Sequence, residues 1–192
     1  DLEHLEKLGI EFVHSKGCNA NAVAEYVLTV LFRWSQLRGE ALRDLKIGVV
    51  GCGNTGGSLI GYLEKLGLNF AAYDPPKQKR QLNFNSASIE DLLSSNILTF
   101  HTPLTYDGQN PTFHLCDEKW LDNGFKLIIN TSRGGVVDEQ ALIQARKTFH
   151  VRDFILDVWE NEPVFSDEIA HRALIATPHI AGYSRLSLIH IS

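Results

Sequence analysis

Apolar and polar positions follow two different periods along this chain. Runs of consecutive apolar residues, the pattern of buried parallel strands, occupy residues 46–50, 69–73, 97–100, 126–130 and 154–158. Segments whose apolar residues recur at helical spacing separate these runs, at residues 59–66, 89–93 and 139–145. This alternation predicts an α/β fold, a Rossmann-type doubly wound parallel sheet.

The remaining segments show other patterns. Residues 2–8 predict a short helix that ends at Gly9, and residues 10–14 predict a strand that leads into a turn at 15–17. Residues 75–87 are rich in Lys, Gln, Asn and Ser and predict a solvated loop.

A long helix precedes the first strand of the predicted sheet, and we expect Asn21 to cap it. Its apolar positions are Val23, Val27, Val30, Leu31 and Trp34. We interpret residues 21–45 as a connector helix outside the Rossmann unit. On its own, such a helix would expose its apolar positions as a patch that associates non-specifically.

Three glycines follow the first strand in the spacing Gly-x-Gly-x-x-Gly. Gly51 permits a tight turn, Gly53 lets backbone approach a pyrophosphate, and Gly56 lets the next helix pack close to the sheet. We expect that helix to open at Thr55, just after Asn54, and to direct its unpaired N–H groups and the positive end of its dipole at phosphates. The pattern therefore predicts a dinucleotide site.

An acidic residue, Asp74, lies at the end of the second strand, 21 residues after Gly53. A carboxylate at this place accepts hydrogen bonds from adenosine ribose hydroxyls and repels the 2′-phosphate of NADP. NAD is therefore the expected cofactor, although Lys77, Lys79 and Arg80 follow closely and would soften the repulsion.

Composition narrows the class of protein. The 192 residues are 44% apolar, enough for one domain with a sizeable core and appendages. A net charge of −5 without a large basic patch argues against nucleic acid as a partner. No apolar run approaches the ~18–20 residues of a membrane span. The three cysteines lack metal-binding spacing, so we expect no metal site. Together these observations predict a cytoplasmic enzyme. The chain lacks Met and begins at Asp1, so we interpret it as a fragment of a longer protein.

Polar residues lie after the predicted strands, at the edge where such sheets bind ligands. Thr102 and Arg133 follow two strands, Asp157 ends a third, and His179 follows another short apolar run. A dehydrogenase of hydroxy acids must bind a carboxylate, polarise the reacting oxygen and move a proton. Arginine binds carboxylates through a planar fork, histidine suits proton exchange near neutral pH, and Glu162 is placed to orient an imidazole.

Each of these residues alone also fits a structural role. His179 fits a loop hydrogen bond, Arg133 a surface ion pair and Glu162 a solvated turn. Their joint placement in a predicted dinucleotide-binding fold favours the chemical interpretation.

Three segments, at residues 131–134, 156–163 and 177–182, read Thr-Ser-Arg-Gly, Leu-Asp-Val-Trp-Glu-Asn-Glu-Pro and Thr-Pro-His-Ile-Ala-Gly. They resemble the signature segments of the D-isomer-specific 2-hydroxyacid dehydrogenases, and the resemblance runs in order through residues 9–183. It implies an NAD-dependent oxidoreductase.

The resemblance also implies roles for single residues. Arg133 would bind the substrate carboxylate and the reacting oxygen, Glu162 would support the histidine, and His179 would be the acid and base. The residues implied to contact NAD, beyond the glycine turn, are Asp74, Thr102, Asp157 and Gly182. Tyr183 would touch the substrate.

Further segments are most similar to one branch of the family, whose members oxidise a small phosphorylated hydroxy acid and form homodimers; these segments are 16–20, 73–76, 100–105, 111–115 and 179–183. In the domain organisation of the family, residues 1–20 would correspond to a remnant of a substrate domain and residues 46–180 to the NAD-binding domain. Residues 181–192 would begin a return segment, whose tail after about Leu186 departs from the family.

Two other functions remain open on sequence alone. One is a relative that acts on phosphoglycerate, glyoxylate or another 2-hydroxy acid. The other is a non-catalytic NAD(H) sensor, because corepressors share this fold and even the three residues of the predicted catalytic set. A fragment that binds nothing, because its loops lack the other lobe, is a third outcome.

Overall fold

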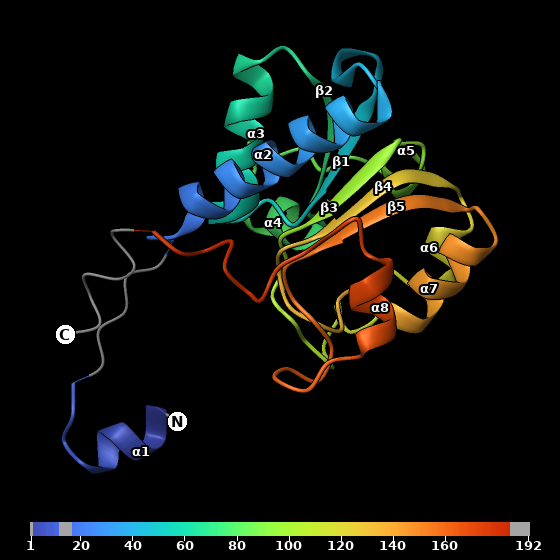
Figure 1. Ribbon diagram of the computed structural model, residues 1–192. Helices are drawn as coiled ribbons and strands as arrows, with labels where there is room; N and C mark the ends of the chain where they lie inside the picture. Colours follow the sequence, from blue (N-terminus) through green and yellow to red (C-terminus); the bar gives the residue numbers. More distant parts are fainter. Residues whose placement is uncertain (1, 12–16, 185–192) are drawn as a thin grey trace.

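Six parallel strands form one sheet in a computed structural model that describes residues 2–11 and 17–184 (Figure 1). The strands are β1 (Lys46–Val50), β2 (Asn69–Tyr73), β3 (Ile97–Phe100), β4 (Phe125–Asn130), β5 (Val151–Leu156) and β6 (Ile175–Ala176). Their order across the sheet is β2-β1-β3-β4-β5-β6. The chain therefore reverses its direction of winding between β1 and β3, which confirms the predicted doubly wound sheet.

Helices cover both faces of the sheet. On one face, α2 (Ala20–Arg38) packs against α3 (Asn54–Lys65), and the short η1 (Leu42–Asp44) leads into β1. The helices on the other face are α5 (Ile89–Leu93), α6 (Glu118–Leu121), α7 (Glu139–Lys147) and α8 (Asp167–Arg172). Two more short helices are α1 (Leu2–Lys7), which lies apart from the sheet in Figure 1, and α4 (Pro75–Arg80), which follows β2.

The core is divided by the sheet into two layers. Successive side chains of a strand point to opposite faces, so Leu127 and Ile129 of β4 join the cluster under α2 and α3, whereas Ile128 joins the cluster under α5 to α8. This two-sided burial explains why the strands read as continuous apolar runs.

The helix predicted before the sheet exists, but its surroundings differ from the expectation. Its apolar positions, including Val27 and Trp34, are buried against the sheet rather than exposed. Trp34 Nε1 donates to Asp153 Oδ2 over 2.9 Å, and Arg38 pairs with the same carboxylate, which lies in β5. The predicted exposed apolar patch is therefore wrong, because α2 completes the core of the sheet.

Several predicted boundaries also need correction. Asn21 does not cap α2, which begins at Ala20 with Asn19 in the N-cap position. Helix α3 begins at Asn54, one residue before Thr55 and five before the predicted segment 59–66. The first half of the predicted loop 75–87 is helix α4.

The remaining differences concern short elements and undescribed positions. Helices α6 and α8 were not predicted, because four and six residues give too few apolar repeats to show a period. The predicted strand at 10–14 and turn at 15–17 lie largely outside the described residues, as does the predicted tail after Leu186.

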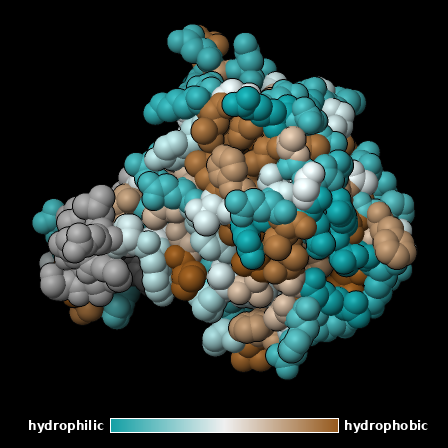
Figure 2. Space-filling view, turned by 45° about the horizontal axis from the view of Figure 1, so that its top comes forward, coloured by the Kyte–Doolittle hydropathy of each residue, from teal (hydrophilic) through white to brown (hydrophobic). Residues whose placement is uncertain are grey.

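The surface is mixed in character. Figure 2 shows apolar areas interspersed among hydrophilic ones on the face in view. None of the helices in the described ranges combines the length and apolar character that a membrane-spanning helix requires. The cysteines Cys18, Cys52 and Cys116 form no disulfide in that part of the chain.

Candidate functional site

The glycine turn after β1 is shaped by close packing at two of its three glycines. Gly51 has φ +86°, and a Cβ there would lie within 3 Å of His101 and Thr102. A Cβ on Gly56 would overlap the carbonyl oxygen of Gly51. At Gly53, by contrast, a Cβ would meet no described atom within 4 Å. The first and third glycines are thus required by the fold, while the second leaves open space at the N-terminus of α3.

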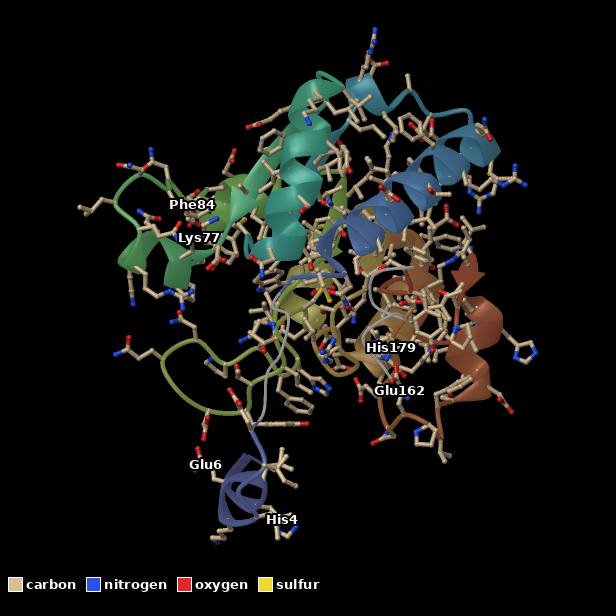
Figure 3. The ribbon with its side chains drawn as sticks, turned by 90° about the vertical axis from the view of Figure 1, so that its left-hand side faces the viewer. His4, Glu6, Lys77, Phe84, Glu162 and His179 are labelled. Atoms are coloured by element: carbon tan, nitrogen blue, oxygen red, sulfur yellow. The ribbon has the colours of Figure 1, made fainter. Side chains whose placement is uncertain are left out.

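Asp74 joins this turn to the start of α4. Its Oδ2 accepts from the backbone N–H of Cys52 over 2.9 Å, and its Oδ1 accepts from the backbone N–H of Lys77 over 2.8 Å. The ammonium of Lys77 donates to the carbonyl oxygen of Cys52 over 2.6 Å and lies 4.5 Å from the centre of the Phe84 ring (Figure 3). Lys77 is therefore tied to the turn, whereas Arg80 lines the adjacent cavity.

Two cavities lie side by side at the carboxyl ends of β1 and β3, where the winding reverses. One, of about 480 Å³, is lined by Gly51, Gly53, Asp74, Arg80 and part of the loop 105–112. The other, of about 660 Å³, is lined by Asn19, Thr55, Ser132, Arg133, Asp157, His179, Gly182 and Tyr183. They share a wall formed by His101, Thr102 and Pro103. Such a switch point is the usual ligand site of a doubly wound sheet.

The donors around these cavities fit a dinucleotide. The open space at Gly53 lies at a helix N-terminus, which favours a phosphate. The buried Oγ1 of Thr102, on the shared wall, has no hydrogen-bond partner within the described part of the chain. A ligand that spans both cavities would pass this hydroxyl and satisfy it.

His179 and Glu162 form a pair at the larger cavity (Figure 3). His179 Nδ1 lies 2.9 Å from Glu162 Oε2, and Glu162 Oε1 accepts from the backbone N–H of Trp159 over 2.8 Å. The His179 side chain is 44% exposed, so its ring is accessible from the cavity. Because Nδ1 is occupied by Glu162, Nε2 is the nitrogen left to exchange a proton with a ligand.

The side chain of Asp157, which is 1% exposed, holds the loop that carries His179. The Asp157 carboxylate accepts from the backbone N–H groups of Ile180 and Ala181 over 2.8 and 2.9 Å, and from the Thr177 hydroxyl over 2.5 Å. The family resemblance predicted only a cofactor contact for Asp157. Its place at a strand end was the visible signal, but its bonds to the His179 loop depend on tertiary structure.

Arg133 lies on a turn that Asn130 organises at the end of β4. The Asn130 Oδ1 accepts from the Ser132 backbone N–H and hydroxyl over 3.0 and 2.7 Å, and its Nδ2 donates to the Arg133 carbonyl oxygen over 3.0 Å. Arg133 lines the same cavity as His179, and its Nη1 donates to the carbonyl oxygen of Ser132 over 2.7 Å. The larger cavity is thus lined by an arginine, whose guanidinium can bind a carboxylate, and by a histidine, whose imidazole can exchange a proton.

A second histidine, His101, lines both cavities but is not suited to proton exchange. Burial lowers the pKa of His101 to about 3, so this ring stays neutral near pH 7. Its Nε2 lies 3.0 Å from Thr99 Oγ1. Of the two histidines on the larger cavity, the exposed and carboxylate-paired His179 is the one suited to proton exchange.

The structure thus brings most of the predicted site residues together. Those that line neither cavity are Asn54, Gly56 and Glu162; Glu162 reaches the site through His179. The predicted set lacked His101, Asn19 and Ser132. Thr102 and Arg133, the neighbours of His101 and Ser132, were already candidates, but no spacing rule singles out these two residues or Asn19.

Comparisons with known proteins agree with this geometry. Residues 21–181 match the family described as D-isomer specific 2-hydroxyacid dehydrogenase, NAD binding domain. An erythronate-4-phosphate dehydrogenase from Pseudomonas paraeruginosa is 43% identical over 187 residues, which are 96% of this chain and 49% of that protein. One from Bacteroides thetaiotaomicron is 36% identical over 96% of this chain and 54% of that protein. The chain spans about half the length of these curated relatives.

A solved structure shares the architecture. The D-lactate dehydrogenase from Aquifex aeolicus, complexed with NAD and lactic acid, superposes with a TM-score of 0.74 at 25% identity. The similarity covers 98% of this chain and 68% of that one.

Proposed function

The chain belongs to the D-isomer specific 2-hydroxyacid dehydrogenases as their NAD-binding domain, and from this premise we propose that it forms the NAD-binding and catalytic part of a 4-phosphoerythronate dehydrogenase. The proposed reaction oxidises 4-phospho-D-erythronate to (R)-3-hydroxy-2-oxo-4-phosphooxybutanoate, a step of pyridoxal 5′-phosphate biosynthesis. The identity of 43% to a relative of that name supports this substrate. It exceeds the 25% identity to the D-lactate enzyme.

One observation carries the chemical proposal: Arg133 and the His179–Glu162 pair meet at one cavity. In the proposed reaction, the Arg133 guanidinium binds the substrate carboxylate and the reacting oxygen. His179 Nε2 accepts the hydroxyl proton as the alcohol is oxidised. Glu162, 2.9 Å from Nδ1, stabilises the imidazolium that forms. NAD, when bound, supplies the acceptor for the hydride.

We propose that the glycine turn and Asp74 hold the adenosine half of the cofactor. Asp74 keeps lone pairs free for ribose hydroxyls, because each oxygen already accepts only one backbone N–H. The residues proposed to contact NAD besides Asp74 are Gly51, Gly53, Asn54, Thr55 and Gly56 at the glycine turn, and Thr102, Asp157 and Gly182 at the other strand ends. Tyr183, on the rim of the larger cavity, is proposed to touch the substrate.

The test is a substrate panel on a full-length protein that contains this chain, with NAD and 4-phosphoerythronate, 3-phosphoglycerate or a glyoxylate-type 2-hydroxy acid. We expect the highest kcat/KM for 4-phosphoerythronate. Higher kcat/KM for another acid would reassign the substrate within the family. Turnover of none, together with NADH-dependent capture of a protein partner, would favour the non-catalytic sensor.

The division into a substrate-domain remnant at 1–20, a connector helix at 21–45, an NAD-binding domain at 46–180 and a return segment from 181 remains a proposal. So do the homodimer and the cytoplasmic location. Light scattering of the full-length protein would test the oligomeric state.

A further inference from the structure

Two glutamates outside the cavities exchange hydrogen bonds. The backbone N–H of Glu160 donates to Glu139 Oε1 over 2.7 Å, and the backbone N–H of Glu139 donates to Glu160 Oε1 over 3.2 Å. Glu139 is the first residue of α7, whereas Glu160 lies in the loop after β5. The two bonds join segments that are 21 residues apart in sequence.

His114 adds a third connection to this pair. Its Nε2 lies 3.1 Å from Glu160 Oε1, its Nδ1 lies 3.4 Å from Asp138 Oδ2, and its ring stacks on Phe113. His114, Asp138 and Glu160 offer ligand atoms within 4.8 Å of one another. The carboxylates of Asp138 and Glu160 each face a different nitrogen of the ring. We call Glu139, Glu160, His114 and Asp138 the loop clasp.

The loop clasp lies next to the two loops that carry Arg133 and Glu162. A Cβ on Gly134, next to Arg133, would overlap the carbonyl oxygen of Trp159 and crowd the Glu160 nitrogen. The Trp159 backbone N–H in turn donates to Glu162. The loop with Arg133 and the loop with Glu162 are therefore in backbone contact, and the loop clasp fastens them next to this contact.

We propose that Glu139 and Glu160 are positioning residues that set the placement of Arg133 relative to the Glu162–His179 pair across the larger cavity. The inference rests on the proposed roles of Arg133 and His179. Neither glutamate lines the cavity, so both act through the loops. A misplacement of about 1 Å can cost up to about a hundredfold in rate.

The environment of Glu139 disfavours the ionised form of its carboxyl group. Burial raises the pKa of Glu139 to about 7, and the charges of Glu160, Asp138 and Glu162 add to the rise. The hydrogen bond from the Glu160 backbone acts in the opposite direction. A buried acid among three others is unfavourable, unless its bonds to the neighbouring loop compensate.

The test compares Glu139→Ala, which removes the acceptor for the Glu160 N–H, with Glu139→Gln, which keeps an oxygen there. Gln140→Ala, at an exposed position in the same turn of α7, is the matched control. In the full-length protein we expect Glu139→Ala to lower kcat at least tenfold with the Kd for NADH within twofold. Glu139→Gln should stay within threefold of wild type in kcat, and Gln140→Ala should match wild type.

Amide hydrogen exchange of this chain gives a readout independent of turnover. Glu139→Ala should speed exchange at Glu160 and also at Trp159, whose N–H reports the placement of Glu162. Unchanged kcat in Glu139→Ala would overturn the inference, as would unchanged Trp159 exchange or an equal loss of kcat in Glu139→Gln. If Glu139→Ala does not fold, Glu160→Ala, at a less buried position, should show the same loss of kcat, and wild-type kcat would overturn the inference.

His179→Ala separates this inference from the proposed function. If His179→Ala abolishes turnover while Glu139→Ala leaves it intact, only the positioning role fails. If His179→Ala turns over normally, the proposed function itself fails.

Discussion

The backbone N–H of His179 donates to the backbone carbonyl oxygen of Asp157 over 2.7 Å, so the residue that directly follows β5 holds the backbone of the histidine. The Asp157 carboxylate holds the next two backbone N–H groups of the same loop, at Ile180 and Ala181. The proposed base is thus attached to the sheet through one buried side chain. This relationship makes Asp157 a structural support of the site as well as a proposed cofactor contact.

Asp157→Asn should destabilise the chain. The amide replaces one acceptor oxygen with an N–H₂ group, which faces a backbone N–H or a hydroxyl that needs an acceptor, and a buried donor left unpaired costs about 1–3 kcal/mol. Urea unfolding of wild type and variant measures this loss. Asp44→Asn, at an exposed position in η1, is the control and should change the unfolding free energy by less than about 0.5 kcal/mol. An equal effect of both substitutions would contradict the role of Asp157.

His179→Ala should lower kcat of the full-length protein by about 10²–10⁴-fold, the usual contribution of a general acid or base. NADH affinity of this chain, measured by calorimetry, should stay within twofold, because the nucleotide-binding turn lies at the other cavity. His171→Ala, an exposed histidine on α8, serves as the control and should leave kcat unchanged. Turnover of His179→Ala at the wild-type rate would refute the assignment.

Asp74→Asn should reduce the preference of this chain for NADH over NADPH by about tenfold, since it removes the charge that repels a 2′-phosphate. Asparagine still caps a helix, so α4 should persist. Calorimetric titration with both nucleotides measures the ratio of the two Kd values. Asp117→Asn, which makes the same change at the N-cap of α6, should leave the ratio unchanged. An equal preference in wild type and Asp74→Asn would remove Asp74 from the cofactor site.

Glu139→Gln should change how stability depends on pH. The pKa of Glu139 is about 7 in the folded chain, above its ordinary value of 4.5, so the unfolded chain loses this proton first as pH rises. Wild type therefore loses up to about 3 kcal/mol of stability from this group between pH 4.5 and 7, at 1.4 kcal/mol per pKa unit. The variant lacks this loss, so its unfolding free energy relative to wild type should be higher at pH 8 than at pH 5. A constant difference would mean that Glu139 ionises normally.

Local signals were strong enough to predict the sheet and the glycine turn. The strands are buried on both faces and read as apolar runs, and Gly51 and Gly56 occupy places where a Cβ would overlap other atoms. The start signal of α4 was overlooked: Asp74 at the N-cap and Pro75 at the first helical position are typical of a helix start, although the following residues are polar.

By itself, the sequence determined the order of the strands along the chain, the place of the glycine turn and the chemistry available at the strand ends, because each depends on neighbouring residues or on a fixed period. Only the tertiary structure decided what covers α2, what holds the His179 loop and which groups fasten the Arg133 loop. Those answers depend on contacts such as Trp34 with Asp153 and Glu139 with Glu160. Such pairs are far apart in sequence and carry no period, so they become visible only when the fold brings the segments that carry them together.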